Sequence, residues 1–277
     1  MQERERHEIV ARIVRQGDPD RYLAALFAPK AARAHLLALY GLNIELSSIA
    51  EQATEPVLGE IRLQWWRDAI HKAARGQTVG HPVADAIGET LKACPLSRSR
   101  LSALIEARAF DISVKTMPDW PSLKTYLHDT AGALFQLAAE ILGGDSEALA
   151  PAARSAGLAY GLTCLMRALP SHTAQRRVDL PADLLLRHDL SPERLLAGET
   201  NAGLSLLLGG LRREVRTGLN DAMRHAGQLS RAERTAFLPL SLVDPYLAAL
   251  KTVEQDPLHR IARINPLYRL WRLATWR

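Results

Sequence analysis

The sequence has 277 residues, of which 47% are hydrophobic, values suited to a single globular domain over 1–277. Its net charge of +5 and pI near 9.4 favour an acidic partner, a phosphorylated ligand or an anionic membrane surface. Aromatic residues make up only 5% and none interleaves with a basic run, which argues against nucleic-acid binding. Alanine and leucine dominate without strand-like alternation, so we expect an all-α fold.

The two cysteines and the amino terminus indicate a cellular compartment. Cys94 and Cys164 stand far apart in apolar surroundings, as buried, reduced thiols of a cytosolic protein do, and a disulfide between them is the alternative. The first ten residues lack the apolar core of a secretory signal and alternate acids with bases, unlike a mitochondrial presequence. We therefore expect a cytoplasmic protein of bacterial type.

Glycine, proline and capping residues mark the boundaries of the predicted helices. A charged N-terminal helix occupies most of 1–17 and ends at Gly17, and Asp18 then provides an N-cap with Pro19 in the first turn. In chain order we expect helices over 3–16, 19–28, 29–52, 56–75, 82–94, 98–115, 122–142, 144–169, 182–188 and 192–197. The rest should be helical to the end, with Pro239, Pro245, Pro257 and Pro266 dividing the last forty residues into short pieces.

Three features of the middle of the chain bear on packing. Ser122 is the predicted cap of its helix, and the small residues Ala131 and Gly132 should let two helices approach closely. A loop is expected from Pro170 to Pro181, because proline removes an amide donor.

The stretch from Gly157 to Pro181 has the frame of a diphosphate-binding helix. Its apolar residues recur at helical spacing, which predicts one buried face. Ala168 and His172 are four residues apart, so on an unbroken helix their side chains stack one turn above each other. An Asp pair at that spacing could hold Mg²⁺ against a diphosphate, but neither residue is acidic.

This stretch resembles the second aspartate-rich region of the squalene/phytoene synthase family. The residues that match the family's G-x-A-x-Q-L-T-N-I-L-R-D helix and the following G-R-x-Y-L-P are Gly157, Ala159, Leu162, Thr163, Arg167, Arg177, Val178, Leu180 and Pro181. Ala168 and His172 take the places of its two Asp residues. The resemblance covers nearly the whole chain and implies one isoprenoid-synthase-like bundle, in which helices 29–52 and 144–169 face each other across a central cavity.

An earlier stretch, Y-G-L-N-I-E-L-S-S-I-A-E, resembles the first aspartate-rich region of the same family, Y-A-F-C-R-x-x-D-D-x-x-D. Tyr40 matches, and Ser47 and Ser48 take the places of two adjacent Asp residues. Glu51 keeps an acid at the third position, and Glu45 adds a carboxylate that the synthases lack there. Serine hydroxyls coordinate Mg²⁺ poorly compared with carboxylates, so the resemblance implies no catalytic residues, no metal site and no cofactor.

The resemblance also implies candidates for ligand binding. They are Tyr40, Glu45, Glu51, Arg167, His172, Arg176 and Arg177. Because acids are replaced while arginines persist, we expect a positively charged cavity that takes an anion without metal. The alternative is that Arg167 and Arg177 pair with Glu45 or Glu51 and keep a former active site folded. Asp111, near a family Asp, is either a polar group of the cavity or an exposed or ion-paired helical residue.

Three stretches, W-W-R-D, R-A-x-P-x-H and R-R-V-x-L-P, resemble the branch that includes mitochondrial respiratory complex I assembly factors, synthase-like proteins not known for synthase chemistry. The resemblance implies a degenerate prenyl synthase homologue, a pseudoenzyme, that assembles the proton-pumping NADH dehydrogenase. A subunit or assembly intermediate of that complex would be its partner, at the cytoplasmic face of the inner membrane. Two alternatives remain: a prenyltransferase that uses Mg²⁺ and prenyl diphosphates, and an isoprenoid- or lipid-binding protein.

The segment 266–277 predicts a basic C-terminal helix. Its apolar stripe and its arginines are Leu267, Leu270, Trp271 and Ala274, beside Arg269, Arg272 and Arg277. A basic helix with tryptophan can lie on a membrane surface as a peripheral contact. We favour packing against the bundle, with the arginine stems over apolar surface.

Overall fold

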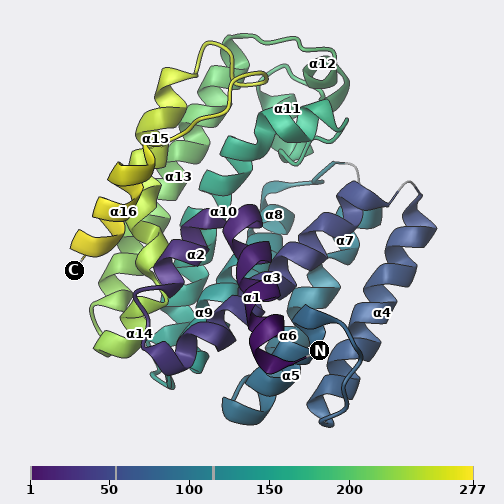
Figure 1. The fold of residues 1–277 in the computed structure, drawn as a ribbon. Helices are drawn as coiled ribbons and strands as arrows, with labels where there is room; N and C mark the ends of the chain where they lie inside the picture. The colour runs from purple at the N-terminus through teal and green to yellow at the C-terminus, as the bar shows by residue number, and fades with distance from the viewer. Residues whose placement is uncertain (1, 54, 114–115, 277) are drawn as a thin grey trace.

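The computed structural model describes residues 2–53, 55–113 and 116–276, and its helices form a bundle (Figure 1). In chain order they are α1 (Glu3–Gly17), α2 (Pro19–Ala25), α3 (Lys30–Gln52), α4 (Pro56–Ala74), α5 (Pro82–Ala93), α6 (Arg98–Ala107), α7 (Ala109–Ser113), α8 (Trp120–Leu127), the π-helical η1 (His128–Gly132), α9 (Ala133–Ile141), α10 (Leu149–Ala174), α11 (Ala182–Arg187), α12 (Pro192–Leu196), α13 (Ala202–Ala226), α14 (Arg231–Thr235), the 3₁₀-helical η2 (Leu238–Leu242), α15 (Val243–Thr252) and α16 (Pro266–Thr275). Over the described ranges no strand forms, and one isolated backbone bridge joins Thr116 and Val178. The predicted all-α class is confirmed.

Helix α10 lies at the centre of the bundle, where it packs against α13, η1 and α9. Helix α3 packs against α1, α5 and α9, and α4 packs against α5 and α3. Figure 1 shows α16 at one side of the bundle and α4 at the opposite side. The long helices α3 and α10 therefore have their neighbours arranged around them.

Glycine allows α10 and η1 to approach closely. A Cβ atom added at Gly157 would lie 2.5 Å from the backbone nitrogen and Cα of Gly132. Real Cβ atoms do not come so close to a backbone, so any side chain at Gly157 would push the two elements apart. The predicted close packing at Gly132 is confirmed, and its partner is the first matched glycine of α10.

The predicted loop from Pro170 to Pro181 is wrong in its first part, because α10 continues to Ala174. Proline removes one backbone donor and ordinarily kinks or ends a helix, but here its ring is buried inside the bundle. The amide of Gln175 donates to the carbonyl of Ser171 at 3.1 Å, so helical bonding resumes beyond the proline. The additional turn carries His172 on the same helix as Ala168.

Other boundaries differ by smaller amounts. The helix predicted over 98–115 is two helices, α6 and α7, which break at Arg108; its predicted end at Lys115 lies outside the described residues. Asp119, and not Ser122, caps α8 by accepting the Ser122 amide at 2.8 Å. Asp18 caps α2 as predicted, with the Arg21 amide donating to its carboxylate at 3.0 Å.

Helix α16 packs against η2 and α2, as favoured, but with the face opposite its apolar stripe. Leu273 is buried, and Arg269 pairs with Asp20 at 2.9 Å. The exposed residues include the whole stripe, Leu267, Leu270, Trp271 and Ala274. Arg277, expected in this helix, lies outside the described residues. Across the described ranges, no helix combines the length and hydropathy needed to cross a bilayer.

Candidate functional site

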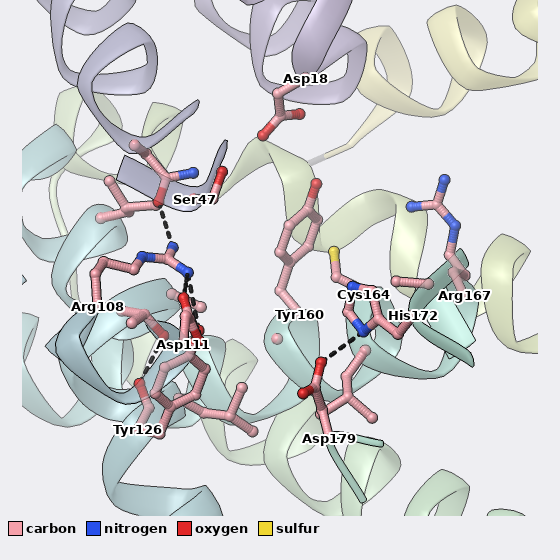
Figure 2. Close-up of a pocket in the computed structure, with 18 of the residues that line it drawn as sticks. Asp18, Ser47, Arg108, Asp111, Tyr126, Tyr160, Cys164, Arg167, His172 and Asp179 are labelled. Atoms are coloured by element: carbon pink, nitrogen blue, oxygen red, sulfur yellow. Dashed lines mark hydrogen bonds and ion pairs between the residues drawn. The ribbon is translucent and has the colours of Figure 1, made fainter. Parts of the chain in front are cut away.

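A cavity of about 420 Å³ opens between α3 and α10 (Figure 2). Ser47 and Glu51 line it from α3, and Ala168 and His172 line it from α10. The prediction that these two helices face each other across a cavity is therefore confirmed. The motif-like segments of the sequence meet in space although Glu51 and Ala168 are 117 positions apart.

After α10 the chain reverses direction, so that two residues that follow the helix line the cavity. Arg176 has a φ of 59°, in the left-handed region that commonly ends helices, and the amide of Arg177 donates to the carbonyl of His172 at 2.8 Å. The reversed chain brings Arg177 and Asp179 beside the last turn of α10. Arg176 itself is exposed and does not line the cavity.

Asp179 is the centre of the first charged group in the cavity. Its carboxylate lies 2.6 Å from Nδ1 of His172 and 3.1 Å from the guanidinium of Arg177. Burial raises the pKa of Asp179, but the hydrogen bond and charge of His172, together with Arg177, outweigh burial and hold the pKa below its ordinary value. This carboxylate stays ionised and is already paired with His172 and Arg177, the cationic side chains that an anionic ligand would need.

Arg108 is the centre of the second charged group. Its guanidinium donates to Asp111 at 3.0 Å, to the hydroxyl of Tyr126 at 2.8 Å and to the amide oxygen of Asn43 at 2.8 Å. Asp111 lines the cavity and is ion-paired at once, so both expectations for it apply. Arg177 lies 3.8 Å from the same carboxylate, which joins the two groups.

Asp20, in the first turn of α2, is the centre of the third charged group. Arg269 approaches its carboxylate to 2.9 Å and Arg167 to 3.6 Å, and the hydroxyl of Tyr246 donates at 2.8 Å. Burial raises the pKa of Asp20, and the two arginines offset only part of this rise. The Arg167 guanidinium also lies 3.5 Å from the centre of the Tyr246 ring, a cation–π contact.

The expectation of a positively charged cavity is wrong. Five acids line it, Asp18, Asp20, Glu51, Asp111 and Asp179, against four arginines, Arg21, Arg108, Arg167 and Arg177, and one histidine. Each of these arginines has a carboxylate within 4.0 Å. The predicted pairing of Arg167 and Arg177 with Glu45 or Glu51 is also wrong. Arg167 pairs with Asp20 of α2, and Arg177 pairs with Asp179, two residues further along its own segment, and with Asp111 of α7.

Three other candidates from the sequence lie outside this cavity. Tyr40 is buried beside it, with Arg21 5.8 Å from its ring centre, and burial raises its pKa to about 12. Glu45 and Ser48 line a separate pocket of about 270 Å³ on the other side of α3. Successive side chains of a helix point in different directions around its axis, so Ser47 lines the cavity and Ser48 lines the separate pocket.

The sequence did not indicate several residues of the cavity lining. These are Asp18, Asp20, Arg21, Asn43, Tyr126, Tyr160, Cys164 and Asp179. Position was the available signal for four of them: Asn43 stands in the first family-like stretch, and Tyr160, Cys164 and Asp179 stand in the second. Cys164 and Cys94 are free thiols, as expected, but both are half-buried where burial was expected, and desolvation raises the pKa of Cys164.

Within the described ranges, one group of three side chains brings metal-ligating atoms within 4.8 Å of one another: Glu3, His7 and Glu89. It lies on α1 and α5, outside the cavity. Arg6 bonds to Glu89, and Nε2 of His7 lies 3.1 Å from the same carboxylate, so Glu89 already has two partners. The cavity carboxylates of the described chain form no such group. The absence of a metal site stays a prediction.

Comparisons with known proteins place this geometry in a family. The family model described as squalene/phytoene synthase matches residues 14–271. The chain is 26% identical over 253 residues to NADH dehydrogenase (ubiquinone) complex I, assembly factor 6, of Rattus norvegicus. The matched region covers 91% of this chain and 76% of that protein. It is also 26% identical over 259 residues to phytoene synthase of Thermus thermophilus, with 92% and 86% covered.

The fold agrees with a solved structure. Squalene synthase HpnC from Alicyclobacillus acidocaldarius superposes with a TM-score of 0.80 at 19% identity, over 92% of this chain and 96% of that chain. The isoprenoid-synthase-like all-α bundle expected from the sequence is therefore confirmed. With the family match extending over almost all of its length, the chain belongs to the squalene/phytoene synthase family.

Proposed function

We propose that the protein is a non-catalytic assembly factor for respiratory complex I, the proton-pumping NADH dehydrogenase. The observation that carries the proposal is the pairing inside the cavity, where each arginine is already held by a carboxylate of the chain. The similarity to complex I assembly factor 6 supports the same reading. Its partner would be a subunit or assembly intermediate of that complex.

The former motif positions support a loss of synthase chemistry. Ser47, Ala168 and His172 stand where the resemblance places aspartates, and the structure puts all three in one cavity. Mg²⁺ requires carboxylate or phosphate oxygens in near-octahedral geometry, which a hydroxyl, a methyl and an imidazole do not supply. Without a metal, the diphosphate leaving group would lose the main stabilisation of its developing charge.

Four of the five acids that line the cavity are already ion-paired, and Glu51 supplies only a single carboxylate in place of those ligands. Asp179 and Asp111 are each bonded to an arginine, and Asp20 has two arginines and a tyrosine hydroxyl. A metal or a diphosphate would have to break these ion pairs and leave a buried charge unpaired, which costs several kcal/mol, about 3–5. We therefore propose that the network serves to hold the bundle together.

An isoprenoid- or lipid-binding role is the second candidate, and two observations favour it. The cavity persists, and apolar side chains line part of it: Phe110, Met117, Leu123, Leu127, Leu134 and Leu165. In addition, Nε of Arg108, Arg167 and Arg177 is buried without a hydrogen-bond partner in the described part of the chain. Calorimetric titration with farnesyl diphosphate distinguishes a non-catalytic protein from a synthase. Mg²⁺-dependent binding at micromolar affinity would support the synthase.

The proposed site of action is the cytoplasmic face of the inner membrane, with α16 as the contact. Leu267 and Trp271 are 78% and 55% exposed, and the nearby Arg260 and Arg263 are also exposed. Apolar side chains beside arginines suit an anionic membrane surface. Sedimentation with phosphatidylglycerol vesicles should recover the protein, and Leu267→Glu with Trp271→Glu should reduce binding roughly ten-fold. Leu206→Glu, on α13 and 65% exposed, is the matched control.

Deletion of the gene tests the assembly role directly. We expect NADH:quinone activity and the amount of assembled complex in membranes to fall, and expression of the wild-type chain to restore both. Unchanged complex levels, together with loss of a squalene- or phytoene-type lipid in the same cells, would reject the assembly role in favour of the enzyme.

A further inference from the structure

Helix α4 carries an exposed apolar row on the side of the molecule opposite α16 (Figure 1). Val57, Ile61 and Trp65 are spaced four residues apart and are 64%, 60% and 40% exposed, with Leu58 beside them at 47%. The opposite face of α4 is buried through Leu63 and other residues against the bundle. A row at this spacing forms a continuous strip along one helix face, which single scattered apolar residues do not.

The strip ends at an aromatic pocket, the one of about 270 Å³ that Glu45 and Ser48 line. The ring centres of Trp65, Trp66 and His81 lie 5.0 to 5.3 Å apart with their planes steeply inclined to one another. Nδ1 of His81 is buried with no hydrogen-bond partner in the described part of the chain, so these ring contacts hold the imidazole in place. The result is a small aromatic enclosure with rings on several sides.

Glu45 gives this pocket an unpaired negative charge. No ion pair or side-chain hydrogen bond to its carboxylate occurs within the described ranges, although the residue is half-buried. The arginine in the lining, Arg62, donates to Gln52 at 3.2 Å. A carboxylate beside tryptophan rings is the environment that an ammonium or guanidinium group prefers, by charge and by cation–π attraction.

We propose that the strip and the pocket form one docking site for a protein segment with an apolar helix face and one lysine or arginine. The apolar face covers Val57, Ile61 and Trp65, and the basic side chain enters the pocket and pairs with Glu45. Glu55 and Glu60 are also exposed near the strip, so this face opposes an anionic membrane and suits a basic protein partner. The inference rests on the proposed function, since it takes the partner to be a protein of the complex under assembly.

A titration tests the pocket without the partner. With N-acetyl-arginine methylamide as the probe, we expect shifts of the indole N–H NMR signals of Trp65 and Trp66. Glu45→Gln should weaken this binding roughly ten-fold, because the charge-assisted pair is lost while the shape is kept. Equal shifts with neutral N-acetyl-norleucine methylamide, or an unchanged affinity for Glu45→Gln, would overturn the assignment of a cation pocket.

A complementation experiment tests the strip. In cells that lack the gene, Val57→Ser with Ile61→Ser should leave assembled complex several-fold below the wild-type level, at equal protein amount. Leu206→Ser, an equally exposed leucine on another helix, should restore the complex fully. Full restoration by the double variant would overturn the docking site while the proposed function stands. If deletion itself leaves the complex unchanged, the proposed function fails, and the pocket is decided by the titration alone.

Discussion

Replacing Gly157 with alanine perturbs the contact between α10 and η1 at its closest point. The new methyl would lie 2.5 Å from the backbone nitrogen and Cα of Gly132, whereas non-bonded carbon atoms pack at about 3.5–4.0 Å. No flexible side chain can move aside, so the two backbones must separate. Overpacking of this kind costs roughly 3 kcal/mol, and removing a glycine from a helix interior offsets about 1 kcal/mol. The expected net loss of stability is therefore about 2 kcal/mol.

Gly209→Ala is the matched control, because Gly209 also lies inside a helix but its new Cβ would meet only arginine nitrogens at 3.7 and 3.9 Å. It should gain about 0.5–1 kcal/mol. Urea unfolding measures both changes, and the thermal midpoint of Gly157→Ala should fall by roughly 4–8 °C. If Gly157→Ala were as stable as Gly209→Ala, the close approach of the two backbones would be refuted.

Three further substitutions probe the charged groups of the cavity, and a fourth, at Arg187 outside it, is a control. Burial raises the pKa of Asp179, but its two cationic partners hold it below 3.8, so its stabilisation is present above that value and lost as the pH falls through the lower folded-state pKa. In Asp179→Asn, the free energy of unfolding from urea titrations should therefore fall less steeply below pH ~4 than in the wild type. The same pH dependence in both proteins would contradict the ion pairs. Arg108→Met should cost about 3 kcal/mol by calorimetry because it leaves a buried carboxylate without its main partner, whereas Arg187→Met, in an exposed pair, should stay within about 1 kcal/mol. Tyr246→Phe should cost about 1–3 kcal/mol, since buried Asp20 loses its hydroxyl donor; a loss near zero would show that the hydrogen bond contributes little.

The frame of the site could be predicted from the sequence because it is local. The spacing of Ala168 and His172 along α10, and of Ser47 and Glu51 along α3, is fixed by helical geometry once the family resemblance supplies the register. Pro170 misled the prediction of where α10 ends, because a proline that normally ends a helix is retained where tertiary packing supports it.

The charge balance of the cavity could not be predicted, because the segments that carry its ion pairs are far apart in the sequence, although three of the pairs are themselves local. Asp20 looks like an ordinary acid in the first turn of a helix, and only the folded chain brings Arg167 beside it. For the same reason, the amphipathic pattern of α16 did not predict which of its faces packs against the bundle. Its pairing of Arg269 with Asp20 turns the arginine side inward and leaves Trp271 outside.

The contacts of Asp20 also bear on how the chain folds during synthesis. The hydroxyl of Tyr246, 226 positions further along the chain, donates to this carboxylate, and Arg269 reaches it from the last helix. A ribosome adding roughly 5–20 residues per second exposes the first helices many seconds before these partners emerge. Until then Asp20 has neither of them, so the cavity wall it belongs to can close only after the C-terminal segment has docked. Contacts of such long sequence separation slow folding, and they make the last helix the step that completes the interior of the protein.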